Sequence, residues 1–193
     1  MDMSATDARA GRLRPITVVK CLIVAACALF LSVGACAVAG RHTRDSNLEE
    51  RFLSNESGFA ALLTEVSADE KLEMLRPDKV RYAGRVFSPE DFTEMEHLGF
   101  SRQRWTRYRQ QILGFGIVQI TKSRGEIEFR VDQGSFWNGD SYKGYEYSLV
   151  PPAGHQKASL DAYRHLADDK LPFGGYQVYK PLKGNWYIYL FIN

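Results

Sequence analysis

The spacing of apolar residues changes from a helical to an alternating pattern near Gly114. Before that glycine, apolar side chains recur every three or four positions, which is typical of helices with one buried face. Residues 47–66 follow this spacing, and Gly58 weakens the middle, so we expect two helices rather than one. A further short helix is predicted over 68–75, before Pro77.

Two more helices have clear start and stop signals. Ser88 followed by Pro89 suits the N-cap and the first turn of one helix, and Gly99 suits its end. Ser101 is the expected N-cap of the next helix, which runs to about Leu113. The predicted buried stripe of this second helix consists of Trp105, Tyr108, Ile112 and Leu113.

The part of the chain after Gly114 is rich in β-forming residues. The predicted strands are 115–122, 126–132 and 142–150, the last ended by Pro151-Pro152. Residues 160–169 are expected to be helical, and the final segment is expected to form a hairpin around 182–185. Its last strand is apolar or aromatic on both faces, which favours a central or covered position. Helices followed by a mainly antiparallel sheet predict an α+β fold, preceded by a signal or anchor segment.

The first forty residues differ from the rest. Four basic side chains lie in residues 1–20, and residues 21–40 carry no charge. A basic segment before an apolar stretch that ends in small residues indicates an export signal. Twenty apolar residues are also long enough to cross a bilayer core of about 30 Å as a helix.

Three interpretations of residues 21–40 remain open. Val33-Gly34-Ala35-Cys36 resembles the bacterial lipobox, and this resemblance implies cleavage before Cys36 and lipidation of its sulfur. Alternatively, Ala37–Ala39 is a small-x-small cleavage site that releases a free periplasmic protein, or residues 21–40 stay uncut as an anchor. All three place the domain on the extracytoplasmic side. We expect membrane attachment through Cys36.

The length of the remaining chain suits one domain, and its charge is balanced. Residues 41–46 form a short polar tether, and 47–193 are expected to be a single α+β domain that folds without its leader. Without residues 1–40 the chain carries 21 basic and 21 acidic side chains, so a neutral domain gives no electrostatic reason to bind nucleic acid. All three cysteines, Cys21, Cys27 and Cys36, precede this domain, so we expect no disulfide in it.

Candidate catalytic chemistry is sparse. The four histidines have no metal-ligand spacing, and no P-loop, nucleophile elbow or dinucleotide fingerprint is present, so we expect no metal, no cofactor and no enzyme activity. A hydrolytic site could only be assembled from scattered residues, namely Glu126, Asp132, Asp140 and His155. The four arginines between 102 and 109 are interpreted as a solvated face paired with nearby acids rather than as an anion site.

The stretch 132–148, DQGSFWNGDSYKGYEYS, is the most unusual of the chain. Asn138-Gly139-Asp140 is typical of a turn, although its oxygens could also hold calcium. Aromatic side chains on both faces of the sheet suit one that is partly exposed or that binds something. The residues that we select as candidate ligand contacts are Trp137, Asn138, Asp140, Lys143 and Tyr145.

Three segments carry a resemblance to a known group of proteins. RWTRYRQQILGFGIVQI, KGYEYS and the terminal NWYIYLFIN resemble a family of uncharacterised bacterial proteins, many with export leaders. The resemblance covers roughly residues 50–193. It implies a shared fold and no particular activity or site.

The expected extracytoplasmic location and the missing catalytic pattern together favour one function. We expect a non-catalytic cell-envelope protein, attached to a membrane through an N-terminal lipid or helix, that binds another envelope component. A periplasmic inhibitor or immunity-type protein is the alternative, and a hydrolase with scattered carboxylates is a further one.

Overall fold

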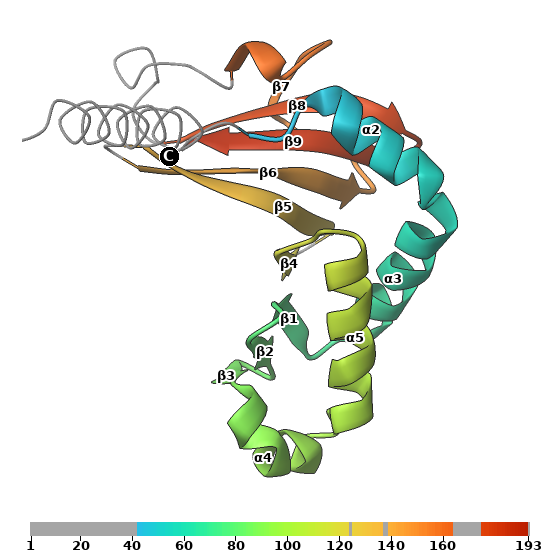
Figure 1. Ribbon diagram of the computed structural model, residues 1–193, viewed down its shortest axis with the longest axis vertical. Coiled ribbons are helices and arrows are strands. Elements are labelled where there is room, and N and C mark those ends of the chain that lie inside the picture. The colour runs from blue at the N-terminus through green and yellow to red at the C-terminus, as the bar shows by residue number, and fades with distance from the viewer. Residues whose placement is uncertain (1–41, 124, 137–138, 164–174, 193) are drawn as a thin grey trace, which may run out of the picture. The chain divides into compact units, whose positions relative to one another are not determined.

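The computed structural model describes residues 42–123, 125–136, 139–163 and 175–192 (Figure 1). The expected leader with Cys36, the turn residues Trp137 and Asn138, and most of the expected helix 160–169 lie outside these ranges. Among the described residues, no helix combines the length and the apolar character needed to cross a bilayer.

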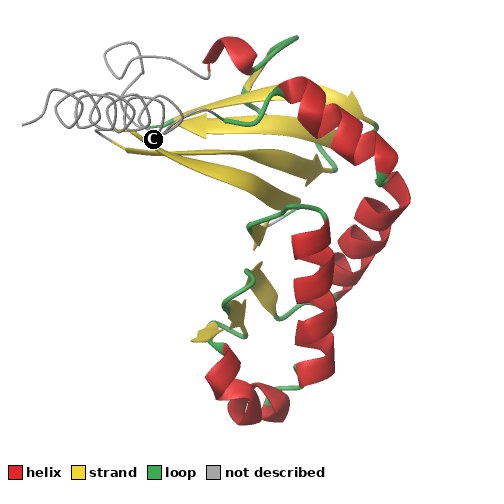
Figure 2. Cartoon of the chain, in the orientation of Figure 1, coloured by secondary structure: helices red, strands yellow, loops and turns green. Residues whose placement is uncertain are grey.

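The described elements are helices, short 3₁₀ turns and strands (Figure 2). The helices and turns are α2 (Asp45–Ser54), α3 (Glu56–Ala68), η1 (Pro89–Asp91), α4 (Phe92–His97), α5 (Arg102–Gly114) and η2 (Asp161–Tyr163). The strands are β1 (Leu72–Leu75), β2 (Val80–Tyr82), β3 (Arg85–Phe87), β4 (Gln119–Ser123), β5 (Glu126–Phe136), β6 (Gly139–Ser148), β7 (His155–Gln156), β8 (Tyr176–Lys183) and β9 (Trp186–Ile192).

The strands form one sheet in the order β3-β2-β1-β4-β5-β6-β9-β8-β7. Every pairing is antiparallel except that of β7 with β8, which is parallel. The predicted α+β class with a mainly antiparallel sheet is therefore confirmed. The predicted C-terminal hairpin is β8–β9, and β9 lies between β6 and β8, as its apolar character on both faces indicated.

The first helical stretch does consist of two helices, but the break is at Asn55 rather than at Gly58. Asn55 has φ −130°, outside helical geometry, and occupies the N-cap position of α3. Gly58 lies inside α3, where a Cβ would come 2.6 Å from Cζ of Phe115. The absence of a side chain at Gly58 therefore allows Phe115, which follows α5, to pack closely against α3.

The predicted helix over 68–75 is wrong, because Leu72–Leu75 form strand β1. β1 pairs with β2 on one side and with β4 on the other, and its two leucines are buried in the core. Helix α3 ends just before, where Nζ of Lys122 lies 2.8–3.2 Å from the carbonyl oxygens of Val66, Ser67 and Asp69. A distant lysine thus satisfies the last carbonyls of the helix and complements its negative end.

The sheet also begins earlier than expected, since β1, β2 and β3 lie between the helices. The strands β2 and β3 are three residues each, too short for a periodic signal, and are joined by Ala83-Gly84 with φ +52° and +77°. Positive φ at both central residues is the backbone of a type I′ hairpin turn.

The two later helices follow the predicted caps. Ser88 and Asp91 form a reciprocal capping box ahead of α4, and the Ser101 hydroxyl accepts a hydrogen bond from the Arg104 amide at the start of α5. Trp105, Tyr108 and Ile112 are buried as predicted. The prediction that Leu113 is a core residue is wrong, because Leu113 is 55% exposed and follows the buried Ile112 by one position.

One face of the sheet packs against helices through an aromatic cluster. Phe52 of α2 and Phe59 of α3 contact Phe129, Tyr145 and Trp186 from β5, β6 and β9, with ring centroids 5.0–6.2 Å apart. The Tyr145 hydroxyl donates to the carbonyl of Leu48, so its polar end is satisfied although the ring is fully buried. We call this side of the sheet the helix face.

A β-bulge in β5 changes which side chains reach the helix face. Arg130 is opposite Gly144 and Asp132 is opposite Lys143, so Val131 is the extra residue. Before the bulge, odd-numbered residues of β5 face the helices. After it, Asp132 does so beside Lys143, because one inserted residue reverses the alternation.

Gly144 lies directly across from this bulge. A Cβ there would lie well inside contact distance of the Phe129 carbonyl oxygen and 2.9 Å from Cα of Arg130, both backbone atoms. We therefore predict that Gly144→Ala lowers the free energy of unfolding by about 1–3 kcal/mol, the usual cost of overpacking. Gly114→Ala is the control, because nothing lies within 4 Å of its Cβ. Urea unfolding of both variants tests this, and equal stabilities would contradict it.

Candidate functional site

The second face of the sheet carries tyrosines and charged residues, and none of the described helices packs on it. Strand alternation places there, from β5, β6, β8 and β9, the side chains of Glu126, Glu128, Arg130, Tyr142, Glu146, Gln177, Tyr179, Tyr187, Tyr189 and Phe191. We call this side the tyrosine face. Tyr179, Tyr187 and Tyr189 form a buried cluster of their own, with Tyr142 and Phe191 packed against it.

A cavity of about 170 Å³ lies on the tyrosine face. It is lined by Glu128, Arg130, Tyr142, Gln177, Tyr189 and Phe191. Arg130, Gly144, Tyr189 and Tyr179 form one row across the four strands. Gly144 contributes no side chain to that row, so it leaves space between Arg130 and Tyr189.

Several buried polar atoms around this cavity have no hydrogen-bond partner of normal geometry among the described residues. They are Nε of Arg130, the hydroxyl of Tyr189 and both carboxylate oxygens of Glu146. Tyr189 is 1% exposed and Glu146 is fully buried. An unsatisfied buried polar group costs about 1–3 kcal/mol, so these atoms can each gain from a further hydrogen-bond partner.

The electrostatics of the tyrosine face are dominated by carboxylates. Glu128 and Glu146 are directly opposite each other on β5 and β6, and Glu126 lies on the same face. Burial, together with the charges of Glu126 and Glu128, raises the pKa of Glu146 to about 7. Burial also raises the pKa of Glu128, although the charge of Arg130 acts in the opposite direction.

Arg130 is the cation that lines this cavity among the described residues. Its guanidinium carbon lies 3.5 Å from the centroid of the Tyr142 ring, which is itself stacked on Phe191 at an interplanar angle of 8°. The Tyr142 hydroxyl donates to Asp140, 3.0 Å away. Tyr142 is thus held by contacts on its ring and at its hydroxyl, so this wall of the cavity is preformed.

A second polar cluster lies on the helix face, at the end of the β5–β6 hairpin. Nδ1 of His42 is 2.5 Å from Asp132 Oδ1, and Nε2 is 2.7 Å from the Ser141 hydroxyl. The Thr43 amide donates to the other Asp132 oxygen. A carboxylate can only accept, so Nδ1 carries the proton toward Asp132, which is the connectivity of a Ser-His-Asp triad.

The burial of this cluster runs against a catalytic role. Ser141 is fully buried and His42 is 2% exposed, whereas the Asp132 side chain is 23% exposed. A nucleophile must meet its substrate, so an active triad needs its serine, not its aspartate, on the accessible side. The cluster instead attaches residues 42–43 to the sheet, and the interactions of Asp132 with His42 and Thr43 hold the pKa of its carboxyl below its usual value despite burial.

Lys143 forms a third cluster, adjacent to the second. Its side chain is fully buried, with Nζ 2.6 Å from Asp45 Oδ1 and 3.3 Å from Asp161 Oδ1. Asp45 also accepts from the Ser159 hydroxyl and the Leu160 amide. Although burial acts to raise it, the pKa of Asp45 is lowered by Lys143 and these donors. Residues 42–45, expected to be part of a polar tether, are therefore packed against the sheet.

The selected ligand-contact residues are distributed over different environments. Lys143 and Tyr145 point to the helix face and are fully buried, each with its polar end occupied by Asp45 or by the Leu48 carbonyl. Asp140 is half-buried and bonded to Tyr142, at the edge of the tyrosine face. Trp137 and Asn138 lie outside the described residues.

The scattered hydrolase residues are not brought together. Glu126 lies on the tyrosine face, whereas Asp132 lies on the helix face with His42. His155 is exposed on β7, with its ring 5.4 Å from that of Tyr176. Among the described residues, His, Cys, Asp and Glu side chains do not gather in any group of three or more suited to a metal ion.

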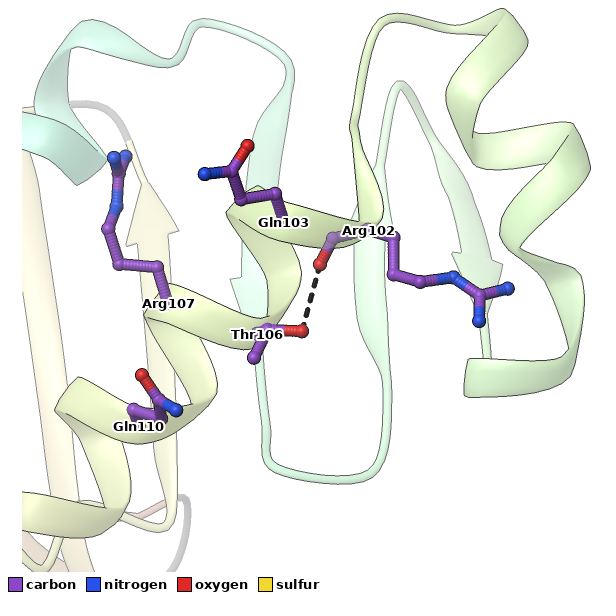
Figure 3. Close-up of a pocket in the computed structure, with 5 residues that line it drawn as sticks. All are labelled: Arg102, Gln103, Thr106, Arg107 and Gln110. Atoms are coloured by element: carbon purple, nitrogen blue, oxygen red, sulfur yellow. Dashed lines mark hydrogen bonds between the residues drawn. The ribbon is translucent and has the colours of Figure 1, made fainter.

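Two of the four arginines of α5 line an open hollow on the exposed side of that helix. It is lined by Arg102, Gln103, Thr106, Arg107 and Gln110, whose side chains spread away from one another (Figure 3). Arg107 pairs with Glu65 at 3.1 Å, Arg104 pairs with the buried Asp69, and Arg102 lies 4.4 Å above the Phe92 ring. These contacts agree with a solvated helix face in which arginines have acidic and aromatic neighbours.

Sequence reasoning did not single out Glu146, Arg130 or Gln177. Glu126, Glu128 and Arg130 occupy alternate positions along β5, and this spacing indicated that they share one face of the sheet. Their alignment with Glu146 and Tyr189 depends on strand register, which no local pattern specified.

Comparison of this chain with protein-family models, with curated proteins and with solved structures found no match.

Proposed function

We propose that this protein is a non-catalytic component of the bacterial cell envelope that binds another envelope component at the cavity of the tyrosine face. The observation that carries this proposal is a set of buried polar groups beside a preformed cavity that lack hydrogen bonds of normal geometry among the described residues. They are Arg130 Nε, the Tyr189 hydroxyl and the Glu146 carboxylate. Concave sites with aromatic walls and a few convergent polar groups are the usual form of ligand sites.

The chemistry of the cavity supports recognition rather than turnover. Its polar groups are a carboxylate, a guanidinium, an amide and phenols, and the guanidinium is already fixed on the Tyr142 ring. The triad-like cluster of His42, Asp132 and Ser141 lies on the opposite face and has its hydroxyl buried. Binding is therefore the function that this arrangement favours.

The binding proposal is tested by filling the cavity. Gln177 lines it, so Gln177→Trp should occlude it, whereas Gln110→Trp places the same side chain in the open hollow of α5. Full-length protein in detergent is incubated with envelope material digested to small fragments, and native mass spectrometry records the bound mass. We expect wild type and Gln110→Trp to retain a ligand that Gln177→Trp loses. Retention by Gln177→Trp, or by none of the three proteins, contradicts the proposal.

The envelope location rests on residues 21–40 and is tested at Cys36. In the lipoprotein interpretation, the Cys36 sulfur takes the lipid, and Cys36→Ala should abolish labelling by a fatty-acid analogue and leave an unprocessed precursor. A transmembrane anchor predicts a different result, since this change leaves twenty apolar residues able to insert. Gel mobility and membrane fractionation distinguish the two. Wild type that takes up no label and migrates like Cys36→Ala would show that the lipid interpretation is wrong.

A further inference from the structure

In the part of the tyrosine face formed by β5, β6, β8 and β9, the described carboxylates outnumber the described cations. Glu126, Glu128 and Glu146 lie there with one guanidinium, that of Arg130, while Arg81 lies on the same face three strands away, on β2. Glu128 and Glu146 are a directly opposed cross-strand pair, an arrangement that is destabilising for like charges. Glu146 is fully buried, and both of its oxygens lack a partner of normal geometry among the described residues. The Tyr179 hydroxyl acts to stabilise its charge, but burial and the two neighbouring glutamates outweigh that contribution.

The cavity beside these carboxylates is rich in acceptors. Glu128 lines it with a carboxylate and Gln177 with an amide oxygen, and the guanidinium of Arg130, which lies against the Tyr142 ring, lines it as well. Tyr189 is 1% exposed, and its hydroxyl has no hydrogen bond of normal geometry among the described residues. This buried hydroxyl is an observation independent of the acidic cluster. An alkylammonium group has three N–H donors and no acceptor, so it complements such a set.

The walls of the cavity also suit a cation. Tyr142, Tyr189 and Phe191 supply aromatic rings, whose faces attract cations, and the protein's own Arg130 lies 3.5 Å from the centroid of the Tyr142 ring. A volume of about 170 Å³ compares with about 30 Å³ per water molecule, so the cavity has room for a group of several heavy atoms.

We propose that the ligand inserts a primary ammonium group on an aliphatic stem, as in the lysine-type side chain of a peptide, into this cavity. The ammonium lies between Glu128, the Tyr189 hydroxyl and the neighbouring Glu146, and the stem lies along Tyr142 and Phe191. This inference rests on the proposed binding function and names its ligand class. It predicts that binding strengthens as Glu146 ionises.

The test uses full-length protein in detergent and isothermal titration calorimetry with two matched probes, an end-blocked lysine peptide and the same peptide acetylated on Nζ. We expect the free amine to bind and acetylation to weaken binding at least tenfold, because acetylation removes the charge and two donors. Glu128→Gln and Tyr189→Phe should each weaken binding of the free amine about tenfold, with Glu94→Gln, on the exposed side of α4, as the unchanged control. Affinity for the free amine should rise between pH 6 and pH 8.

Equal affinity for both probes would overturn the ammonium inference, as would binding that is unaffected by Glu128→Gln and Tyr189→Phe in proteins whose circular dichroism is unchanged. Calcium chloride and a neutral oligosaccharide are titrated in parallel, and cavity-dependent binding of either without binding of the amine also overturns it. If wild type captures an envelope fragment that Gln177→Trp loses, yet no amine binds, the ligand class is wrong while the binding function stands. If nothing is captured and no amine binds, both fail.

Discussion

Lys143→Met is expected to lower the free energy of unfolding by about 3 kcal/mol, because it leaves a buried carboxylate without its cation. The Asp45 side chain is 4% exposed, and Lys143 is the only cation within 3 Å of it among the described residues. Lys180, 3.8 Å from the other Asp45 oxygen, offsets part of the loss, so we expect the lower end of the range of about 3–5 kcal/mol for breaking a buried ion pair. Urea unfolding followed by circular dichroism measures the change.

Lys183→Met is the matched control for that prediction. Lys183 pairs with Glu56 at 2.7 Å, but the two side chains are 57% and 45% exposed. Exposed pairs contribute about 0–1 kcal/mol, so the same substitution should be nearly neutral there. The double variant Asp45→Asn/Lys143→Met should be less destabilised than the sum of its single variants. Similar losses at Lys143 and Lys183 would show that burial of the Lys143 pair has no energetic consequence.

Glu146→Gln is expected to stabilise the protein by about 3–4 kcal/mol at pH 8 and by only about 1 kcal/mol at pH 5. The folded-state pKa of Glu146 is raised to about 7, mainly by burial, whereas an unfolded glutamate titrates near 4.3. Between these values the folded state holds the extra proton, so the stability of wild type falls as pH rises toward 8. The glutamine side chain carries no charge and removes that dependence.

The measurement is the free energy of unfolding of wild type and Glu146→Gln between pH 5 and pH 8. Glu94→Gln serves as the control, since Glu94 is half-exposed and paired with Arg85 at the surface. Its curve should run parallel to that of wild type. A Glu146→Gln curve parallel to wild type over this range would show that Glu146 is not held in an unfavourable charged state.

The first four residues of the KGYEYS segment, Lys143 to Glu146, alternate between the two faces of the sheet. Lys143 and Tyr145 point to the helix face, where they bind Asp45 and the Leu48 carbonyl. Gly144 and Glu146 belong to the tyrosine face, where one leaves space and the other supplies charge. The same short sequence therefore holds α2 in place and shapes the candidate binding site.

Features encoded by neighbouring residues were predictable. Ser88, Ser101 and Gly99 indicated helix ends that the structure confirms, and alternation identified β5, β6 and the final hairpin. The prediction was wrong where a segment is shaped by distant partners. Residues 72–75 look helical in isolation but pair with β2 and β4, and backbone pairing on both sides outweighs a local preference.

The sequence by itself therefore determined the α+β class, the caps of the helices and the two-sided aromatic character of the sheet, because each depends on residues close together in the chain. Only the tertiary structure decided the sites. Strand register placed Glu146 opposite Glu128 and Tyr189 opposite Gly144, across separations along the chain that no local pattern specifies. The bulge at Val131 turned Asp132 from the tyrosine face to His42, and a single inserted residue reverses every side chain that follows it in a strand.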